Sequence, residues 1–215
     1  MFPEILSYIL MITIIDYGMG NLKSVYKAFR KIGIDSKISS ELSDIDNATA
    51  IVLPGVGAFK DCIHNLSKLN LTDAIRKSIR SGKPYLGICL GLQILFSGSE
   101  EFGASSGLGI FPGRVVRFPD NGLKIPHMGW NTVTIRTKPP LFNDVEDNSY
   151  FYFVHSYFVA PEDNSIIAGM THYGDDFTSM IWKDNVIATQ FHPEKSQQLG
   201  LRALKGFSDF VKKQG

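Results

Sequence analysis

Apolar residues occur in short runs along the first half of the chain, and a turn or a helical pattern follows each run. The runs cover residues 12–16, 50–53 and 85–88. Between them, residues 21–32 and the stretch that leads to residue 80 have apolar positions at helical spacing. Strands that are apolar on both faces and alternate with helices are typical of a parallel sheet that helices cover on both sides.

The second half of the chain has a different pattern, in which short strand-like segments are separated by Asn, Asp and Gly. This pattern predicts hairpin strands at residues 114–118, 132–136, 151–159, 166–171, 178–182 and 186–190. Residues 199–212 predict a closing helix whose apolar face contains Leu201, Leu204, Phe207 and Val211. We therefore expect a mixed α/β fold, with a central, mostly parallel sheet flanked by helices and additional antiparallel strands in the second half.

The composition is that of an ordinary globular protein, with 44% hydrophobic and 20% charged residues. A net charge of +1 gives no electrostatic reason to expect nucleic acid or a membrane as a partner. Residues 1–10 lack the basic start and the cleavage site of a signal peptide. Two cysteines alone suit a reducing compartment. We expect a cytoplasmic protein with an N-terminal extension, residues 1–10, and a single domain, residues 11–215.

Cys89 occupies the most informative position of the chain, within the sequence GICLG at 87–91. An apolar strand leads into it, and a predicted helix over residues 90–96 follows, as in a nucleophile elbow. Gly87 and Gly91 would relieve the crowding of such a turn. The start of the helix would stabilise a thiolate, and the backbone N–H of Leu90 would bind an oxyanion. The alternative is a buried cysteine between two packing glycines.

His192 is the candidate base for Cys89, because it ends an apolar strand and is followed by Pro193 and Glu194. In an extended backbone, residues i and i+2 point to the same side, so Glu194 would orient the imidazole of His192. Alone, His-Pro-Glu is more typical of a surface turn. The upstream cysteine elbow favours a nucleophile, base and orienter instead.

The remaining candidate groups have structural interpretations. Cys62 has no elbow around it and is expected to be a bystander. We expect His155 to be a core or interface residue and His64 and His172 to lie at the surface. No set of side chains has zinc-ligand spacing, and residues 18–20 lack the third glycine of a dinucleotide fingerprint. We therefore expect neither a metal nor a cofactor.

Seven segments follow one another in a recognisable order: DYGMGNLKS (16–24), LPGVGAF (53–59), GICLGLQ (87–93), GLGIFPGRVVRF (107–118), PHMGWN (126–131), FVHSY (153–157) and QFHPEKSQ (190–197). With them the chain resembles the class I glutamine amidotransferases, and more narrowly the glutaminase subunits of imidazole glycerol phosphate synthases. The resemblance implies the fold of that class and a triad of Cys89, His192 and Glu194. It also implies hydrolysis of L-glutamine and transfer of ammonia to a (β/α)₈-barrel cyclase. That cyclase converts a phosphoribosyl intermediate into imidazole glycerol phosphate in histidine biosynthesis.

The resemblance implies roles for further residues. The backbone N–H of Val56 would join that of Leu90 in binding the oxyanion. The ends of the glutamine substrate would be held by Gln93, Glu101 and the backbone of Ser156 and Tyr157. The partner interface and the ammonia route would involve Asn21, Met128, Trp130, Tyr152 and Lys195. By its residue type alone, Gln93 could equally lie on an exposed helix face, and Trp130 in the core.

Two other functions are compatible with the motifs. A paralogous glutaminase subunit could supply ammonia to another synthase, for example in amino-sugar assembly, because the partner selects the acceptor. A catalytically silent interaction module could retain the same fold. The presence of Cys89, His192 and Glu194 argues against the silent module.

Overall fold

The computed structural model describes residues 10–120 and 122–214. Most of the expected extension, residues 1–10, lies outside the described residues, and Leu10 packs against the hydrophobic core. Within the described residues, thirteen strands form one sheet, and its longest path has the order β2-β1-β3-β4-β13-β12-β10-β7-β5-β6. None of the described helices combines the length and the apolar character that crossing a membrane requires.

One half of the sheet is parallel, as the sequence predicts for residues 12–16, 50–53 and 85–88. Its strands are β1 (Ile12–Ile15), β2 (Ser36–Ser39), β3 (Ala50–Gly55), β4 (Tyr85–Cys89) and, from near the C-terminus, β13 (Val186–Thr189). The helices of this half are α1 (Leu22–Lys31), α2 (Leu42–Asn47), α3 (Phe59–Lys68) and α4 (Leu71–Arg80). These strands are apolar at nearly every position because helices cover both faces of the sheet.

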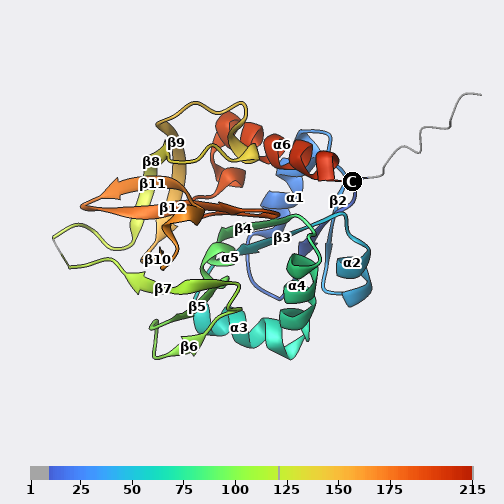
Figure 1. The fold of residues 1–215 in the computed structure, drawn as a ribbon, viewed down its shortest axis with the longest axis horizontal. Helices are drawn as coiled ribbons and strands as arrows, with labels where there is room; N and C mark the ends of the chain where they lie inside the picture. The colour runs from blue at the N-terminus through green and yellow to red at the C-terminus, as the bar shows by residue number, and fades with distance from the viewer. Residues whose placement is uncertain (1–9, 121, 215) are drawn as a thin grey trace, which may run out of the picture.

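Alternate residues of each parallel strand point to opposite hydrophobic clusters. Leu86 and Ile88 of β4 pack in the cluster that contains α1 and α6 (Gln197–Gln214), whereas Tyr85 packs in the cluster that contains α3 and α4. Figure 1 shows α1 and α6 on one side of the sheet and α3 and α4 on the other. The two layers bury β4 and β13 in the middle of the sheet, so the residues that follow these strands start from fixed positions.

The second half of the chain extends the sheet with antiparallel strands. They are β7 (Phe111–Arg117), β8 (His127–Ile135), β9 (Ser149–His155), β10 (Tyr157–Pro161), β11 (Ile167–Tyr173) and β12 (Asp175–Lys183). At one edge, β5 (Phe96–Ser99) pairs antiparallel with β6 (Ser105–Ser106) but parallel with β7. Short helices complete the chain: α5 (Leu90–Gln93), η1 (Pro140–Phe142), η2 (Asn164–Ile166) and η3 (Pro193–Lys195). The expected antiparallel character of this half is therefore confirmed.

Three local predictions are wrong. The helix expected over residues 90–96 ends at Gln93, because Phe96 begins strand β5, which pairs with β6 and β7. The single strand expected over 151–159 is two strands, β9 and β10, which pair with different neighbours. Residues 186–190, expected as a hairpin strand, form β13, which pairs antiparallel with β12 but parallel with β4. The sequence interpretation also missed β2, α2, β5 and β6, which are short and lack a clear apolar period.

Candidate active site

Cys89 lies at a strained turn between β4 and α5. Its φ is 55° and its ψ is −104°, a backbone conformation that residues with a side chain seldom adopt. A Cβ on Gly87 would lie 2.5 Å from the carbonyl oxygen of Gly91, and one on Gly91 would lie 1.9 Å from that of Leu53. The two glycines therefore allow the close approach that the sequence predicts for a nucleophile elbow.

The helix that follows Cys89 is shorter than expected. Helix α5 contains only the four residues Leu90–Gln93. The aligned peptide dipoles of a long helix would stabilise a thiolate at its start, but one turn supplies only a fraction of that field. The predicted stabilisation of Cys89 by a helix is therefore weak, and other donors must contribute.

His192 and Glu194 form a buried pair. Nδ1 of His192 lies 2.8 Å from Oε1 of Glu194, and the two side chains are 2% and 1% exposed. The contact is as predicted, but the reason given for it is wrong. Pro193 starts the 3₁₀ turn η3, so the backbone is not extended through Glu194. Gly200 of α6 permits this packing, because a Cβ there would lie 1.8 Å from the carbonyl oxygen of Pro193.

The second ring nitrogen of His192 is available for chemistry. Nε2 is buried and has no hydrogen-bond partner among the described residues. Burial alone would lower the pKa of His192, but the negative charges of Cys89 and Glu194 and the hydrogen bond to Glu194 outweigh it and raise that pKa above the usual range of imidazole. The arrangement therefore favours an imidazolium beside the Cys89 sulfur, a charge that a cysteine nucleophile requires close by.

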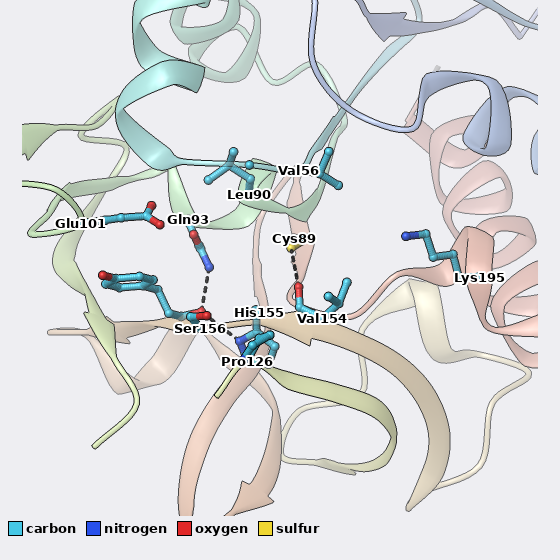
Figure 2. A pocket seen from close by; sticks show the side chains of 12 residues that line it. Val56, Cys89, Leu90, Gln93, Glu101, Pro126, Val154, His155, Ser156 and Lys195 are labelled. Atoms are coloured by element: carbon cyan, nitrogen blue, oxygen red, sulfur yellow. Dashed lines mark hydrogen bonds between the residues drawn. The ribbon is translucent and has the colours of Figure 1, made fainter. Parts of the chain in front are cut away.

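A cavity of about 390 Å³ opens beside Cys89, a size suited to a small ligand. Seven further residues that the sequence interpretation selected line it: Val56, Leu90, Gln93, Glu101, Ser156, Tyr157 and Lys195. Glu101 and Lys195 lie at opposite sides of the cavity in Figure 2, with Cys89 between them. The structure thus brings together residues that are more than a hundred positions apart in the chain.

Two of the lining side chains are held by specific hydrogen bonds. Nε2 of Gln93 donates to the carbonyl oxygen of Tyr157 at 2.8 Å, and Oε2 of Glu101 accepts from the N–H of Phe59 at 2.8 Å. Gln93 is only 4% exposed, so the alternative of an exposed helix position is wrong. Both side chains are fixed before a ligand arrives.

An aromatic surface lies next to the cavity on strands β8 and β9. Met128 is 58% and Trp130 46% exposed, so the alternative of a core tryptophan is wrong. The rings of Trp130 and Tyr152, which are paired across the two strands, meet edge to face at 6.2 Å. Nζ of Lys195 lies 5.8 Å from the centre of the Tyr152 ring and connects this surface to the cavity. Asn21 is placed separately, at the start of α1.

Several residues near the site were not selected from the sequence. Val154 and His155 line the cavity, and the carbonyl oxygen of Val154 lies 4.0 Å from Sγ of Cys89. His155 is 2.9 Å from both His127 and the carbonyl oxygen of Tyr157, and burial lowers its pKa to about 3. Their position in the segment FVHSY was the signal that could have identified them.

The other candidates lie as expected. Cys62 is buried and is not a lining residue of the cavity, and His64 and His172 are exposed. Within residues 10–120 and 122–214, no group of three or more His, Cys, Asp or Glu side chains is arranged to hold a metal ion.

Known proteins resemble this chain along nearly its whole length. A family model described as glutamine amidotransferase class-I matches residues 13–208. A Syntrophotalea carbinolica protein named imidazole glycerol phosphate synthase subunit HisH is 53% identical over 205 residues, which are 93% of this chain and 100% of the relative. A protein of the same name from Aquifex aeolicus is 49% identical over 90% of this chain and 94% of its own.

Solved structures show the same fold at low sequence identity. A structure of PurLQS from Thermotoga maritima has a TM-score of 0.73 and 17% identity, and covers 94% of this chain and 98% of its own. A glutamine amidotransferase from the same organism has a TM-score of 0.61 and 18% identity, over 96% of this chain and 86% of its own. The expected fold class is therefore confirmed.

Proposed function

The chain belongs to the class I glutamine amidotransferases, and within them to the HisH subunits of imidazole glycerol phosphate synthase; on this basis we propose that Cys89, His192 and Glu194 are the catalytic triad with which it hydrolyses glutamine. The observation that supports this assignment most directly is the meeting of three features at one point. A strained cysteine elbow, a buried His192–Glu194 pair and a ligand-sized cavity come together around Cys89.

The reaction is an acyl transfer through a covalent intermediate. The thiolate of Cys89 attacks the side-chain carbonyl carbon of glutamine, forming a C–S bond, and the backbone N–H groups of Leu90 and Val56 stabilise the oxyanion. The imidazolium of His192 gives its proton to the departing nitrogen as the C–N bond breaks, which releases ammonia. His192 then takes a proton from water, the resulting hydroxide attacks the thioester, and glutamate leaves as Cys89 returns to a thiolate.

The cavity suits the free amino-acid end of glutamine. The carboxylate of Glu101 is a partner for the substrate's α-ammonium group, and Gln93 with the backbone of Ser156 and Tyr157 holds the remaining polar atoms. Because Gln93 and Glu101 are already hydrogen-bonded, the substrate meets an ordered site and little side-chain entropy is lost on binding.

The ammonia is passed to a partner subunit. Ammonia that escapes into water at neutral pH becomes ammonium and stops being a nucleophile, so a protected route is needed. We place the docking site for a (β/α)₈-barrel cyclase on the aromatic surface of Met128, Trp130 and Tyr152, with Asn21 and Lys195 beside it. Exposed aromatic side chains next to the cavity suit such an interface.

Partner binding controls the rate through the oxyanion site. Val56 is 37% exposed, and Gly57 has a φ of +97°, so this peptide lies in a segment that glycine makes adaptable. The loss of one oxyanion donor lowers rates by on the order of 10²–10³. A change in the orientation of the Val56 N–H would therefore be enough to make the isolated chain slow and the complex fast.

The relatives named HisH place this chemistry in the synthesis of imidazole glycerol phosphate. The ammonia thus serves a cyclase that acts on a phosphoribosyl intermediate of histidine biosynthesis. Two free cysteines, one of them the nucleophile, suit a reducing compartment, and we assign the protein to the cytoplasm.

Glutamate release by the purified chain, alone and with the cyclase and its phosphoribosyl ligand, tests this function. We expect a low rate alone and an increase on the order of 10²-fold or more in the liganded complex. Full activity without a partner would contradict the coupling, and no glutamate in either sample would contradict the glutaminase assignment.

The docking surface is tested by calorimetric titration of the cyclase. Trp130→Ala should weaken binding by about 2 kcal/mol, or roughly thirtyfold, if Trp130 is a central anchor. Leu69→Ala is the matched control, because it removes an apolar side chain of similar exposure, 41%, at the end of α3. Equal effects of both substitutions would place the interface elsewhere.

A further inference from the structure

Because helix α5 is only one turn long, other groups of the protein must stabilise a negative charge on Cys89. Sγ of Cys89 has two hydrogen-bonding neighbours of opposite kind: it lies 4.0 Å from the carbonyl oxygen of Val154 and 3.5 Å from Nε2 of Gln190. A neutral thiol can donate to Val154. A thiolate has no proton to donate, so the contact with Gln190, which donates, is the one that suits the charged form.

Gln190 is buried, and none of the roles described above involves it. Its side chain is 0% exposed, and its backbone follows directly after β13, two residues before His192. A buried amide that loses its hydrogen bonds destabilises a protein, so the partners of this side chain decide its orientation. Those partners link it to the substrate cavity.

A chain of hydrogen bonds fixes which end of Gln190 faces the sulfur. The carbonyl oxygen of Tyr157 can only accept, so the amide of Gln93 must turn its NH₂ group toward it, at 2.8 Å. The same NH₂ group donates to Oε1 of Gln190 at 3.1 Å. The NH₂ group of Gln190 is therefore the end that faces Cys89. Reversing the Gln190 amide would oppose two NH₂ groups and place an oxygen against the thiolate.

We propose that Gln190 is a catalytic residue, whose amide N–H donates a hydrogen bond to the Cys89 thiolate and holds the sulfur in line with the cavity. This inference rests on the proposed function, in which Cys89 is the nucleophile. The hydrogen bond acts in both steps of the reaction. It stabilises the thiolate before it attacks glutamine, and it stabilises the thiolate again as it leaves when the thioester is hydrolysed. Gln93 is then a positioning residue for Gln190 as well as a contact for the substrate.

The pH dependence of Cys89 alkylation tests this directly. In the full chain carrying Cys62→Ala, Cys89 is the single thiol, and its reaction rate with iodoacetamide follows the thiolate fraction. We expect Gln190→Leu, which keeps the bulk but removes the donor, to move the midpoint of this profile upward by about one pH unit, a tenfold change in ionisation. The glutaminase assay with the cyclase should show a lower kcat and a nearly unchanged KM.

A second variant keeps the test decisive if Gln190→Leu fails to fold. Gln190→Glu has nearly the same shape and can still accept from Gln93, but it places an acidic group against the sulfur and should raise the midpoint further. Ser208→Ala is the control, because it removes another fully buried hydrogen bond, to Leu204 of α6, and should leave the midpoint unchanged. An unchanged midpoint in the folded Gln190 variants would overturn the proposal.

Alkylation also separates this inference from the function on which it rests. The reaction needs neither glutamine nor a partner, so it reports on the environment of Cys89 even if the chain releases no glutamate. A shifted midpoint without glutaminase activity in the parent would support the hydrogen bond and contradict the proposed function. Normal glutaminase activity of the parent, together with an unchanged midpoint in the Gln190 variants, would support the proposed function and contradict the hydrogen bond.

Discussion

The two cysteines of this chain have the same side chain and are both buried, but their surroundings differ completely. Cys62 lies in the middle of α3 and is 0% exposed, and burial raises the pKa of its thiol to about 12. Cys89, 7% exposed, lies at a strained turn beside a cavity and a buried His192–Glu194 pair. Burial by itself therefore makes a thiol inert, and a reactive thiol needs charges and donors placed around it.

The largest difference between the cysteines should appear when each is removed. In the complex with the cyclase, Cys89→Ala should lower glutamine-dependent turnover by on the order of 10⁶, because the nucleophile is lost. Turnover with added ammonium salt should persist, because the acceptor site lies in the partner. Cys62→Ala should change neither rate by more than about twofold. Equal loss of both activities in Cys89→Ala would indicate damage to the fold instead.

The next test concerns the charges around Cys89. His192→Ala should lower glutamate release by on the order of 10⁶, and Glu194→Gln by on the order of 10⁴, because the second variant keeps the base and loses its orientation and charge. Steady-state assays of the complex measure both. A Glu194→Gln enzyme as active as the parent would show that the 2.8 Å contact has no catalytic role.

The backbone of the elbow should respond more in stability than in chemistry. Gly91→Ala forces a Cβ to within 1.9 Å of the Leu53 carbonyl oxygen, so we expect a loss of about 4 kcal/mol in the free energy of unfolding. In Gly33→Ala the new Cβ has no atom within 4 Å, and only the φ of +73° is unfavourable. We expect this variant to lose about 1 kcal/mol in the free energy of unfolding. Urea denaturation of the two variants compares them, and similar losses would refute the role of the close approach.

The smallest expected effect is the pH dependence that the Cys62 thiol gives to the free energy of unfolding. Because its pKa in the folded protein is about 12, against about 9 when unfolded, the folded state holds the proton more tightly. This stabilisation is complete below pH 9 and falls by about 1.4 kcal/mol per pH unit as the pH rises toward 12. The difference in unfolding free energy between the parent and Cys62→Ala should therefore shrink by about 1.4 kcal/mol at pH 10 relative to pH 7.5. An unchanged difference would mean that the thiol does not resist ionisation.

Much of the fold could be predicted because its signals are local. The apolar runs that became β1, β3, β4 and β13 are recognisable in isolation, and so is the helical spacing of α1. The errors arose where distant pairing overrode a local pattern. Residues 94–96 continue the apolar pattern of α5, yet Phe96 pairs with Phe111 of β7 and ends any possibility of a longer helix.

The positions of the triad residues could also be predicted, because the signals for them are local. Gly87 and Gly91 flank Cys89 within five residues, and His192 and Glu194 are two residues apart, so short motifs contain both halves of the triad. The catalytic roles of these residues stay predictions, but their meeting is observed. The reasoning from an extended backbone failed because a 3₁₀ turn brings Glu194 to the ring by another path.

The sequence by itself determined the strand-to-helix elbow, the His192–Glu194 neighbourhood and the family, because each depends on residues close together in the chain. Only the tertiary structure decided that Trp130 is exposed and that Gln93 is buried, since both depend on what packs against a side chain. It alone placed Gln190 against Cys89, 101 positions away, and against Gln93, 97 positions away. A hydrogen bond between such distant residues has no periodicity or spacing in the sequence, because the folding of the whole sheet brings its two partners together.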